Sequence, residues 1–280
     1  MSGLDGLRRV KQSVVAVLNP RPHTLRYRAG VAWRYVRRPL AEVAPWLRGS
    51  REFTNFTYDL SPRNVAYLTA MVALVADRPH EEIAAYVREL QEDRDVASHV
   101  ARIARRLSRD VGIDPVPRFG RRLAWYALVR ALKPRVVVET GVDKGLGTLA
   151  LAAALLRNAG EGSPGRVIAT DIAPKAGVLL QGQYLEVGEI RIGDSIKTLE
   201  TLAEPIDVFV SDSDHSETYE AREYATVRER LKPTSVLVAD NAHCTTKLLE
   251  FALESRRRFL FFREEPEHHW YPGGGAGFAF

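Results

Sequence analysis

The sequence places acidic, amide and imidazole side chains directly after two short apolar segments. Asp212-Ser213-Asp214-His215 follows residues 208–211, and Asp240-Asn241 follows residues 235–239. Oxygen ligands from adjacent strand ends suit a hard divalent cation such as Mg²⁺. A histidine beside a cation-bound hydroxyl can remove its proton near neutral pH. The pattern predicts a metal site with a neighbouring base; solvated strand caps and a surface histidine are the alternative.

A glycine-containing turn follows an earlier apolar segment, residues 135–139. It reads Glu139-Thr140-Gly141-Val142-Asp143-Lys144-Gly145-Leu146-Gly147-Thr148. Glycines let the chain turn sharply at a strand's carboxyl end and let a ligand approach the backbone closely. Their spacing, four and then two residues, is not that of the dinucleotide-binding fingerprint. The turn predicts a cofactor site, and a strand-to-helix turn without a ligand is the alternative.

Two further strand ends carry polar side chains. Asp171 ends the second expected strand of the α/β part, residues 167–171. A carboxylate there can accept hydrogen bonds from both hydroxyls of a ribose. Gly193-Asp194-Ser195 follows the third and could contact an adenine edge. Aspartate also commonly ends strands and caps turns. Because these groups converge on one crevice, together they predict a nucleotide-like ligand more specifically than any one of them.

Strand and helix patterns alternate after residue 121. The expected strands are residues 135–139, 167–171, 190–192, 208–211, 235–239, 259–262 and 276–280. Helices are expected between most of them, including residues 217–231 and 245–256. Such alternation predicts an α/β fold with a doubly wound, mostly parallel sheet. The last two strands are joined only by a loop, which predicts an antiparallel C-terminal edge.

A helical region precedes this alternation. Ser61-Pro62 is typical of a helix start, and further helices are expected near His80 and over residues 96–107. Residues 112–120, with Pro115 and Pro117, read as a connector. We therefore expect three parts: a basic arm (1–54), a helical cap or dimerisation region (55–115) and the α/β domain (116–280).

Composition excludes several classes of protein. The chain has 280 residues, 45% hydrophobic and 27% charged, which excludes a disordered or collagen-like chain. No apolar run approaches the ~20 residues that span a bilayer. Cys244 is the single cysteine, so an intramolecular disulfide is excluded. With no segment typical of a secretion signal, the expected location is the cytoplasm.

The net charge of +5 is unevenly distributed. Residues 1–50 hold ten basic and two acidic residues, a balance of +8, so the remaining 230 residues sum to −3. Such an arm could contact nucleic acid, an anionic membrane or an acidic partner, or serve as a solvated tail. Since no RNA-binding signature accompanies it, we do not expect nucleic acid as the partner.

Residues 121–280 resemble the class I S-adenosylmethionine-dependent methyltransferases, specifically the divalent-metal-dependent O-methyltransferases. The turn E-x-G-x-x-x-G-x-G-T matches their glycine motif, and D-x-D-H and D-N resemble their metal motifs. Where the catechol and caffeoyl-coenzyme A branches usually have a lysine, this chain has His215. That difference resembles the macrocin and mycinamicin type of sugar methyltransferase. The helical region before residue 112 is not covered by the resemblance.

The resemblance implies a Rossmann-like, seven-stranded sheet and a role for each matching residue. Glu139 and Gly141 would hold the methionine end of S-adenosylmethionine, Asp171 its ribose and Asp194 the adenine region. Asp212, Asp240 and Asn241 would bind a divalent cation such as Mg²⁺, with His215 as base and Asp212 beside it. The full set of cofactor residues expected is Glu139, Thr140, Gly141, Gly145, Gly147, Thr148, Asp171, Asp194, Ser195 and Asp212.

The expected activity is methyl transfer to a hydroxyl of a small molecule, such as a sugar of a natural product or a glycolipid. Two alternatives stay open. One is a metal-dependent hydroxylase similar to the cephalosporin hydroxylase family, with iron held by His215, His243 and Asp212. The other is a module that binds nucleic acid or membrane through the basic arm. The helical region could also make a homo-oligomer contact.

Overall fold

The computed structural model describes residues 24–280 apart from 53, 55 and 56. Its main element is a seven-stranded sheet with the order β4-β3-β2-β5-β6-β9-β7. Five neighbouring strands are parallel, and β9 runs antiparallel to both β6 and β7. This confirms the expected doubly wound fold with an antiparallel C-terminal edge. The strands are β2 (Val136–Thr140), β3 (Arg166–Asp171), β4 (Gly188–Ile192), β5 (Ile206–Ser211), β6 (Leu231–Ala239), β7 (Phe259–Arg263) and β9 (Gly275–Ala279).

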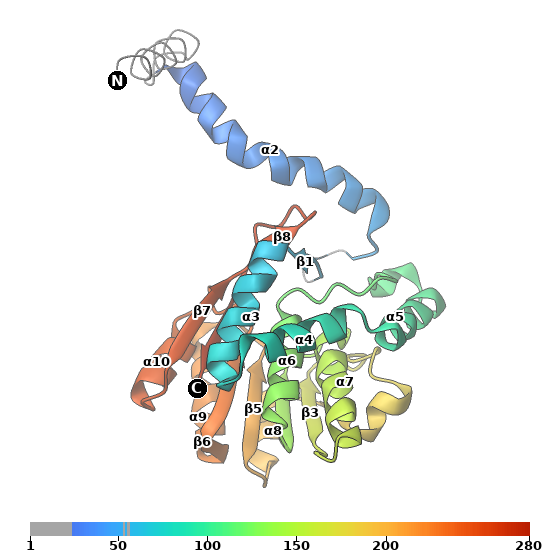
Figure 1. The fold of residues 1–280 in the computed structure, drawn as a ribbon, viewed down its shortest axis with the longest axis vertical. Coiled ribbons are helices and arrows are strands. Elements are labelled where there is room, and N and C mark those ends of the chain that lie inside the picture. The colour runs from blue at the N-terminus through green and yellow to red at the C-terminus, as the bar shows by residue number, and fades with distance from the viewer. Residues whose placement is uncertain (1–23, 53, 55–56) are drawn as a thin grey trace, which may run out of the picture. The chain divides into compact units, whose positions relative to one another are not determined.

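Helices cover both faces of the sheet (Figure 1). One face carries α6 (Arg122–Leu132) and α7 (Leu146–Gly160), with α3 (Pro62–Ala76) and α4 (His80–Gln91) packed against α6. The other carries α8 (Ser195–Thr201), α9 (Glu217–Val227) and α10 (Lys247–Glu254). Because the central strands are covered on both faces, their middle residues are apolar. Val137, Val138 and Phe209 are fully buried.

The N-terminal helical region agrees with the sequence at its helix starts. Ser61 caps α3 by accepting from the Asn64 backbone N–H, and Pro62 occupies the first helical position. Helix α4 begins at His80, and Glu81 and Glu82 occupy its first turn. Helix α5 (Arg94–Arg106) begins two residues before the predicted start, because Asp93 accepts from the Asp95 and Val96 backbone N–H groups. A 3₁₀ turn, η1 (Arg109–Val111), follows it.

Three elements differ from the sequence prediction. Helix α9 ends at Val227, and after the 3₁₀ turn η3 (Arg228–Arg230) the chain enters β6 at Leu231, so residues 228–231 are not α-helical. A two-stranded sheet joins β1 (Asp59–Leu60) to β8 (Pro266–Glu267), inside the loop expected between the last strands. The 3₁₀ turn η2 (Gly182–Glu186) lies between β3 and β4. The β1–β8 pairing depends on residues far apart in the sequence, which local periodicity does not reveal.

The chain separates into two compact units. One comprises residues 51–267 with 272–280 and contains the sheet. The other, within the described residues, comprises 24–50 with 268–271 and contains α2 (Leu25–Gly49). Thr24 caps α2, and no residue of this helix is buried. The sequence had predicted only a basic arm here, so this helix is new; residues 1–23 of the predicted arm lie outside the described residues. No described helix has the length and apolar character needed to cross a membrane.

Helix α7 supplies a test of packing beneath the glycine turn. A Cβ on Gly147 would overlap Glu139 Oε1 and the Trp125 ring, whereas a Cβ on Gly160 in the same helix meets nothing within 4 Å. We expect Gly147→Ala to lower the free energy of unfolding by about 1–3 kcal/mol through overpacking. Gly160→Ala should leave it unchanged or raise it by less than about 1 kcal/mol. Urea unfolding measures both, and equal effects of the two substitutions would contradict this packing.

Candidate functional site

A single cavity of about 550 Å³ lies at the carboxyl ends of the parallel strands. It is lined both by the glycine turn and by the acidic and histidine side chains after β5 and β6. Its volume is in the range that holds a small-molecule cofactor. The predicted residues that line it are Glu139, Gly141, Gly147, Asp171, Asp194, Ser195, Asp212, His215, Asp240 and Asn241.

Backbone hydrogen bonds continue across the strand ends and hold these residues in register. The Gly141 N–H donates to the carbonyl of Thr170 at 2.9 Å, the Asp212 N–H to Thr140 at 2.7 Å and the Asp240 N–H to Ser211 at 2.8 Å. Gly141 has φ +85°, and a Cβ there would overlap the Asp212 carbonyl. A glycine is therefore needed where the turn passes the Asp212 backbone.

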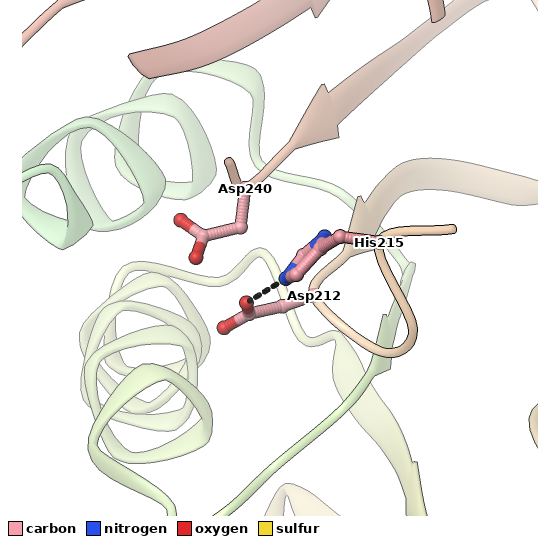
Figure 2. Close-up of side chains that lie close together, drawn as sticks. All are labelled: Asp212, His215 and Asp240. Carbon is pink, nitrogen blue, oxygen red and sulfur yellow. Dashed lines mark ion pairs between the residues drawn. The ribbon is translucent and has the colours of Figure 1, made fainter. Parts of the chain in front are cut away.

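Asp212, His215 and Asp240 form a compact cluster within this cavity (Figure 2). One ligand atom from each lies within 4.8 Å of the others. The His215 Nε2 atom is 3.6 Å from Asp212 Oδ1, the ion pair drawn as a dashed line in Figure 2. Asp240 is buried, while Asp212 and His215 are half-buried. Two carboxylates and an imidazole are donors that a divalent cation accepts.

Two carboxylates control the protonation of His215. Its Nδ1 atom is 3.4 Å from Glu220 Oε1, on the side opposite Asp212. Burial alone lowers the pKa of His215, but hydrogen bonds to Asp212 and Glu220 and their negative charges outweigh it and raise the pKa to about 9. The carboxylates thus favour the imidazolium at neutral pH. A cation bound to the Asp212 carboxylate would lower the pKa of His215 and favour the neutral ring, which is the form that accepts a proton.

Asn241 lies between His215 and Asp240. Its amide Nδ2 is 3.1 Å from His215 Nε2 and 3.2 Å from Asp240 Oδ2. It therefore directs its nitrogen, and not its oxygen, toward the cluster. A ligand role for Asn241 requires the carboxamide to turn by about 180°, an exchange of N and O that side-chain amides make without altering their shape.

Asp240 has a second partner that the sequence did not indicate, the guanidinium of Arg121. Arg121 donates from Nε to Asp240 Oδ1 and from Nη2 to Asp240 Oδ2. Its Nη1 donates to Tyr58 Oη at 3.0 Å and to Glu264 Oε2 at 3.3 Å. All four residues are buried. Burial disfavours the charge of Arg121, but Glu264, Tyr58 and Asp212 outweigh this and raise its pKa.

The arginine restricts how a cation could use Asp240 without excluding it. A carboxylate oxygen has two lone pairs, and Asp240 Oδ1 accepts one hydrogen bond whereas Oδ2 accepts two. Oδ1 thus keeps a lone pair for a cation that also contacts Asp212. The donor set fits a divalent cation, with Asp240 shared between the cation and Arg121.

Glu139 lies under the glycine turn, fully buried. Its Oε2 accepts from the Thr148 hydroxyl, which holds the carboxyl at the start of α7. Burial raises the pKa of Glu139 to about 8, the Asp212 charge adds to this, and the Thr148 hydrogen bond opposes it. Such a carboxyl gains most from a cationic ligand, because a positive charge favours its ionised form.

The other predicted cofactor residues already have protein partners. Asp171 accepts from the Val142 N–H at 2.8 Å and the Asp143 N–H at 2.9 Å, so it stabilises the glycine turn. Asp194 caps α8 by accepting from the Lys197 N–H at 3.2 Å. Thr140, Gly145 and Thr148 lie behind the cavity lining: Thr140 and Thr148 are buried, and Gly145 precedes α7 with φ +90°. These three support the site from behind.

Sequence reasoning missed two buried glutamates of α9. Glu223 accepts from the hydroxyls of Ser195, Ser211 at 3.1 Å, Ser213 at 2.8 Å and Thr140 at 3.3 Å. Glu220 contacts His215 and accepts from Thr245. Their spacing of three residues places both on one side of the helix, and the hydroxyl residues at the strand ends were the available signal. Arg121, Tyr58 and Glu264 carried no comparable signal.

The Arg121 network supports a stability prediction. Arg121→Gln leaves two buried carboxylates without their cation, so the free energy of unfolding should fall by about 3–5 kcal/mol. Arg121→Lys keeps the charge but loses the paired hydrogen bonds to Asp240. Its free energy of unfolding should therefore lie between those of the wild type and Arg121→Gln. The control is Arg63→Gln, which removes an exposed ion pair with Glu265 and should have little effect. Chemical denaturation measures all three, and an equal response of Arg63→Gln and Arg121→Gln would contradict the role of burial.

Comparisons with known proteins agree with this architecture. Residues 138–242 match the family model described as a methyltransferase domain. An O-methyltransferase from Bacillus cereus in complex with SAH is 17% identical, with 70% of this chain and 96% of that chain covered and a TM-score of 0.51. A putative O-methyltransferase from Klebsiella pneumoniae is 15% identical, with 69% and 93% covered and a TM-score of 0.51. No curated protein sequence matches significantly.

At these identities, the likeness to solved structures establishes the fold. The family match covers β2 through the end of β6, the part of the chain that contains the glycine turn and the Asp212–His215–Asp240 cluster. Residues 138–242 therefore match a methyltransferase domain, and the seven-stranded sheet has the fold of these two O-methyltransferases.

Proposed function

We propose that the protein transfers the methyl group of S-adenosylmethionine to a hydroxyl of a small molecule, with help from a divalent cation, and that the acceptor is a sugar or another alcohol. The observation that carries the proposal is the single cavity lined by both the glycine turn and the His215 cluster. A methyl donor held at the turn and an acceptor held at the cluster would share one enclosed space.

Glu139, Gly141, Asp171 and Asp194 are the proposed cofactor residues. Glu139 would pair with the amino group of the methionine end, whose positive charge suits a buried carboxyl. Asp171 Oδ1 retains one lone pair for a ribose hydroxyl, since the carboxylate also accepts from the N–H groups of Val142, Asp143 and Ala173. Gly141 leaves room for close approach of the ligand to the backbone. Sulfonium already activates the methyl group, so the protein's task is alignment and acceptor ionisation.

The methyl acceptor is proposed to bind beside Asp212, His215 and Asp240. Asn241 would be a further ligand of the cation once its amide has turned. When bound, a divalent cation supplies a positive charge that orients the acceptor oxygen and lowers its pKa. His215 receives the acceptor proton at Nε2, the ring nitrogen that faces Asp212. Glu220 at Nδ1 fixes the orientation of the ring and stabilises its charge once the proton has moved.

The His243-based hydroxylase alternative has less support. It requires His215 and His243 to face one cation together with Asp212. In the part of the chain that the structure describes, the group that could hold a metal comprises Asp212, His215 and Asp240, and His243 is not in it. His215 also stands where the catechol-type branch usually has a lysine, which favours an alcohol acceptor over a catechol.

Cofactor binding gives the first test. In calorimetric titrations of S-adenosylhomocysteine, the dissociation constant should decrease as pH rises toward 8, by up to about tenfold per pH unit, because binding its amino group requires ionised Glu139. Binding below pH 8 should release a proton, seen as a dependence of the heat on the buffer. Glu139→Gln should abolish this pH dependence. The absence of binding at any pH would contradict the function, whereas unchanged pH dependence in Glu139→Gln would contradict only the role of Glu139.

Methyl transfer gives the second test. With radiolabelled S-adenosylmethionine, Mg²⁺ and a panel of glycosides and simple alcohols, we expect transfer to at least one acceptor. His215→Ala should lower turnover at least about 10²-fold, the usual contribution of a general base. It should leave the affinity for S-adenosylhomocysteine unchanged.

Two further measurements in this assay distinguish the contribution of the cation from that of His215. A chelator should suppress transfer by the wild-type enzyme, and Asp212→Asn should abolish the response to added Mg²⁺. A matched control, His243→Ala, should keep turnover because it alters a histidine outside the group that could hold a metal. Full activity in chelator would remove the cation from the proposal, and loss in His243→Ala would favour the hydroxylase-type metal set.

A further inference from the structure

Helix α2 has an exposed apolar stripe along its length. Its members recur at intervals of three and four residues, the spacing that places side chains on one face of a helix. Leu25 is 84% exposed, Leu47 67% and Leu40 53%. Trp33, at the border of the stripe, is 57% exposed. The stripe consists of Leu25, Ala29, Ala32, Val36, Leu40, Val43 and Leu47.

The rest of the helix is strongly basic. It carries six arginines, no lysine and a single acidic residue, Glu42. At 3.6 residues per turn, four arginines lie on the face opposite the stripe and two flank it near the N-terminal end. The opposite-face arginines are Arg34, Arg37, Arg38 and Arg48; the flanking ones are Arg26 and Arg28.

Contacts within the same unit leave every member of the stripe exposed except Val43, which is half-buried. Trp46 packs edge-to-face on His269 and Trp270, with ring centroids 6.3 Å and 5.4 Å apart. Glu42 lies 3.7 Å from His268. By the helical period, Trp46 lies beside the stripe, whereas Glu42 lies about 120° from its centre, toward the arginine face. No residue of α2 is buried among the described residues.

We propose that α2 is an interfacial helix that lies flat on an anionic lipid membrane. A basic helix with leucine and tryptophan on one face binds in this way: its apolar face enters the headgroup boundary while arginines pair with anionic lipids. Trp33 and the 79% exposed Tyr35 are residue types that favour this boundary. Pro39 and Pro45 leave two helix carbonyls without a backbone donor, which the hydrated headgroup layer tolerates and the hydrocarbon layer does not.

Charge favours this occupant over two others. Nucleic acid would pair with the arginines but would leave the apolar stripe in water. A second copy of α2 would bury the stripe, but it would bring Arg26 and Arg28 of each copy beside the stripe with Glu42 as the single acid in the helix. An anionic bilayer satisfies both the stripe and the arginines.

The test is cosedimentation of the full chain with two kinds of vesicle, phosphatidylcholine alone and phosphatidylcholine with phosphatidylglycerol. Partitioning should be at least about tenfold stronger to the anionic vesicles and should weaken with salt. Leu40→Gln/Leu47→Gln removes two members of the stripe and should weaken partitioning at least about tenfold. Ala41→Gln, an exposed neighbour on the arginine face, should leave it within about twofold of wild type. Circular dichroism confirms that the variants fold.

Each contrary outcome overturns the proposal. These are equal partitioning into both vesicle types, partitioning that the Leu40→Gln/Leu47→Gln variant retains, and retention on RNA without retention on vesicles. A dimer in sedimentation equilibrium that this variant dissociates and Ala41→Gln preserves, without vesicle binding, would assign the stripe to a second copy. None of these readouts depends on methyl transfer, so the membrane proposal and the proposed function fail separately.

Discussion

The buried guanidinium of Arg121 is the interaction on which the rest of the site depends. It joins Asp240 at the end of β6, Glu264 just after β7 and Tyr58 just before β1, three segments that are far apart in sequence. A buried carboxylate without a partner costs several kcal/mol, which is a large part of the stability of an ordinary domain. Arg121 therefore gives the buried Asp240 carboxyl a cationic partner, and at the same time it connects the N-terminal helical region to the edge of the sheet.

That arrangement has a consequence for metal binding. Asp240 is shared between a permanent cation, Arg121, and the position beside His215 where a divalent cation would contact Asp212. Two cations near one carboxylate repel each other, so Arg121 weakens the attraction of this cluster for a metal ion. It also holds Asp240 in a single orientation, which reduces the rearrangement that metal binding requires. Such a site would bind a metal ion less tightly, but its Asp240 ligand would already be correctly oriented.

The sequence predicted most of the sheet but not the network around it. The apolar segments before Glu139, Asp171 and Asp212 were sufficient for the strands, because a strand buried on both faces is a short apolar run. The errors lie where partners are distant: residues 228–231 leave the helical pattern, β1 and β8 pair across more than two hundred residues, and α2 forms where only a charged arm was expected. Glu220 and Glu223 looked like ordinary acids of an exposed helix, and only packing shows that they are buried.

The sequence by itself determined which chemistry is available and at which edge of the sheet it gathers. Strand ends are local features, and in a parallel sheet their carboxyl ends necessarily meet. Tertiary structure alone decided the electrostatics. Whether Glu139 has a pKa near 8, whether His215 lies between two carboxylates and which cation neutralises Asp240 depend on burial and on residues far away in the chain. Charge interactions act through space and strengthen as water is excluded, so no local pattern contains them.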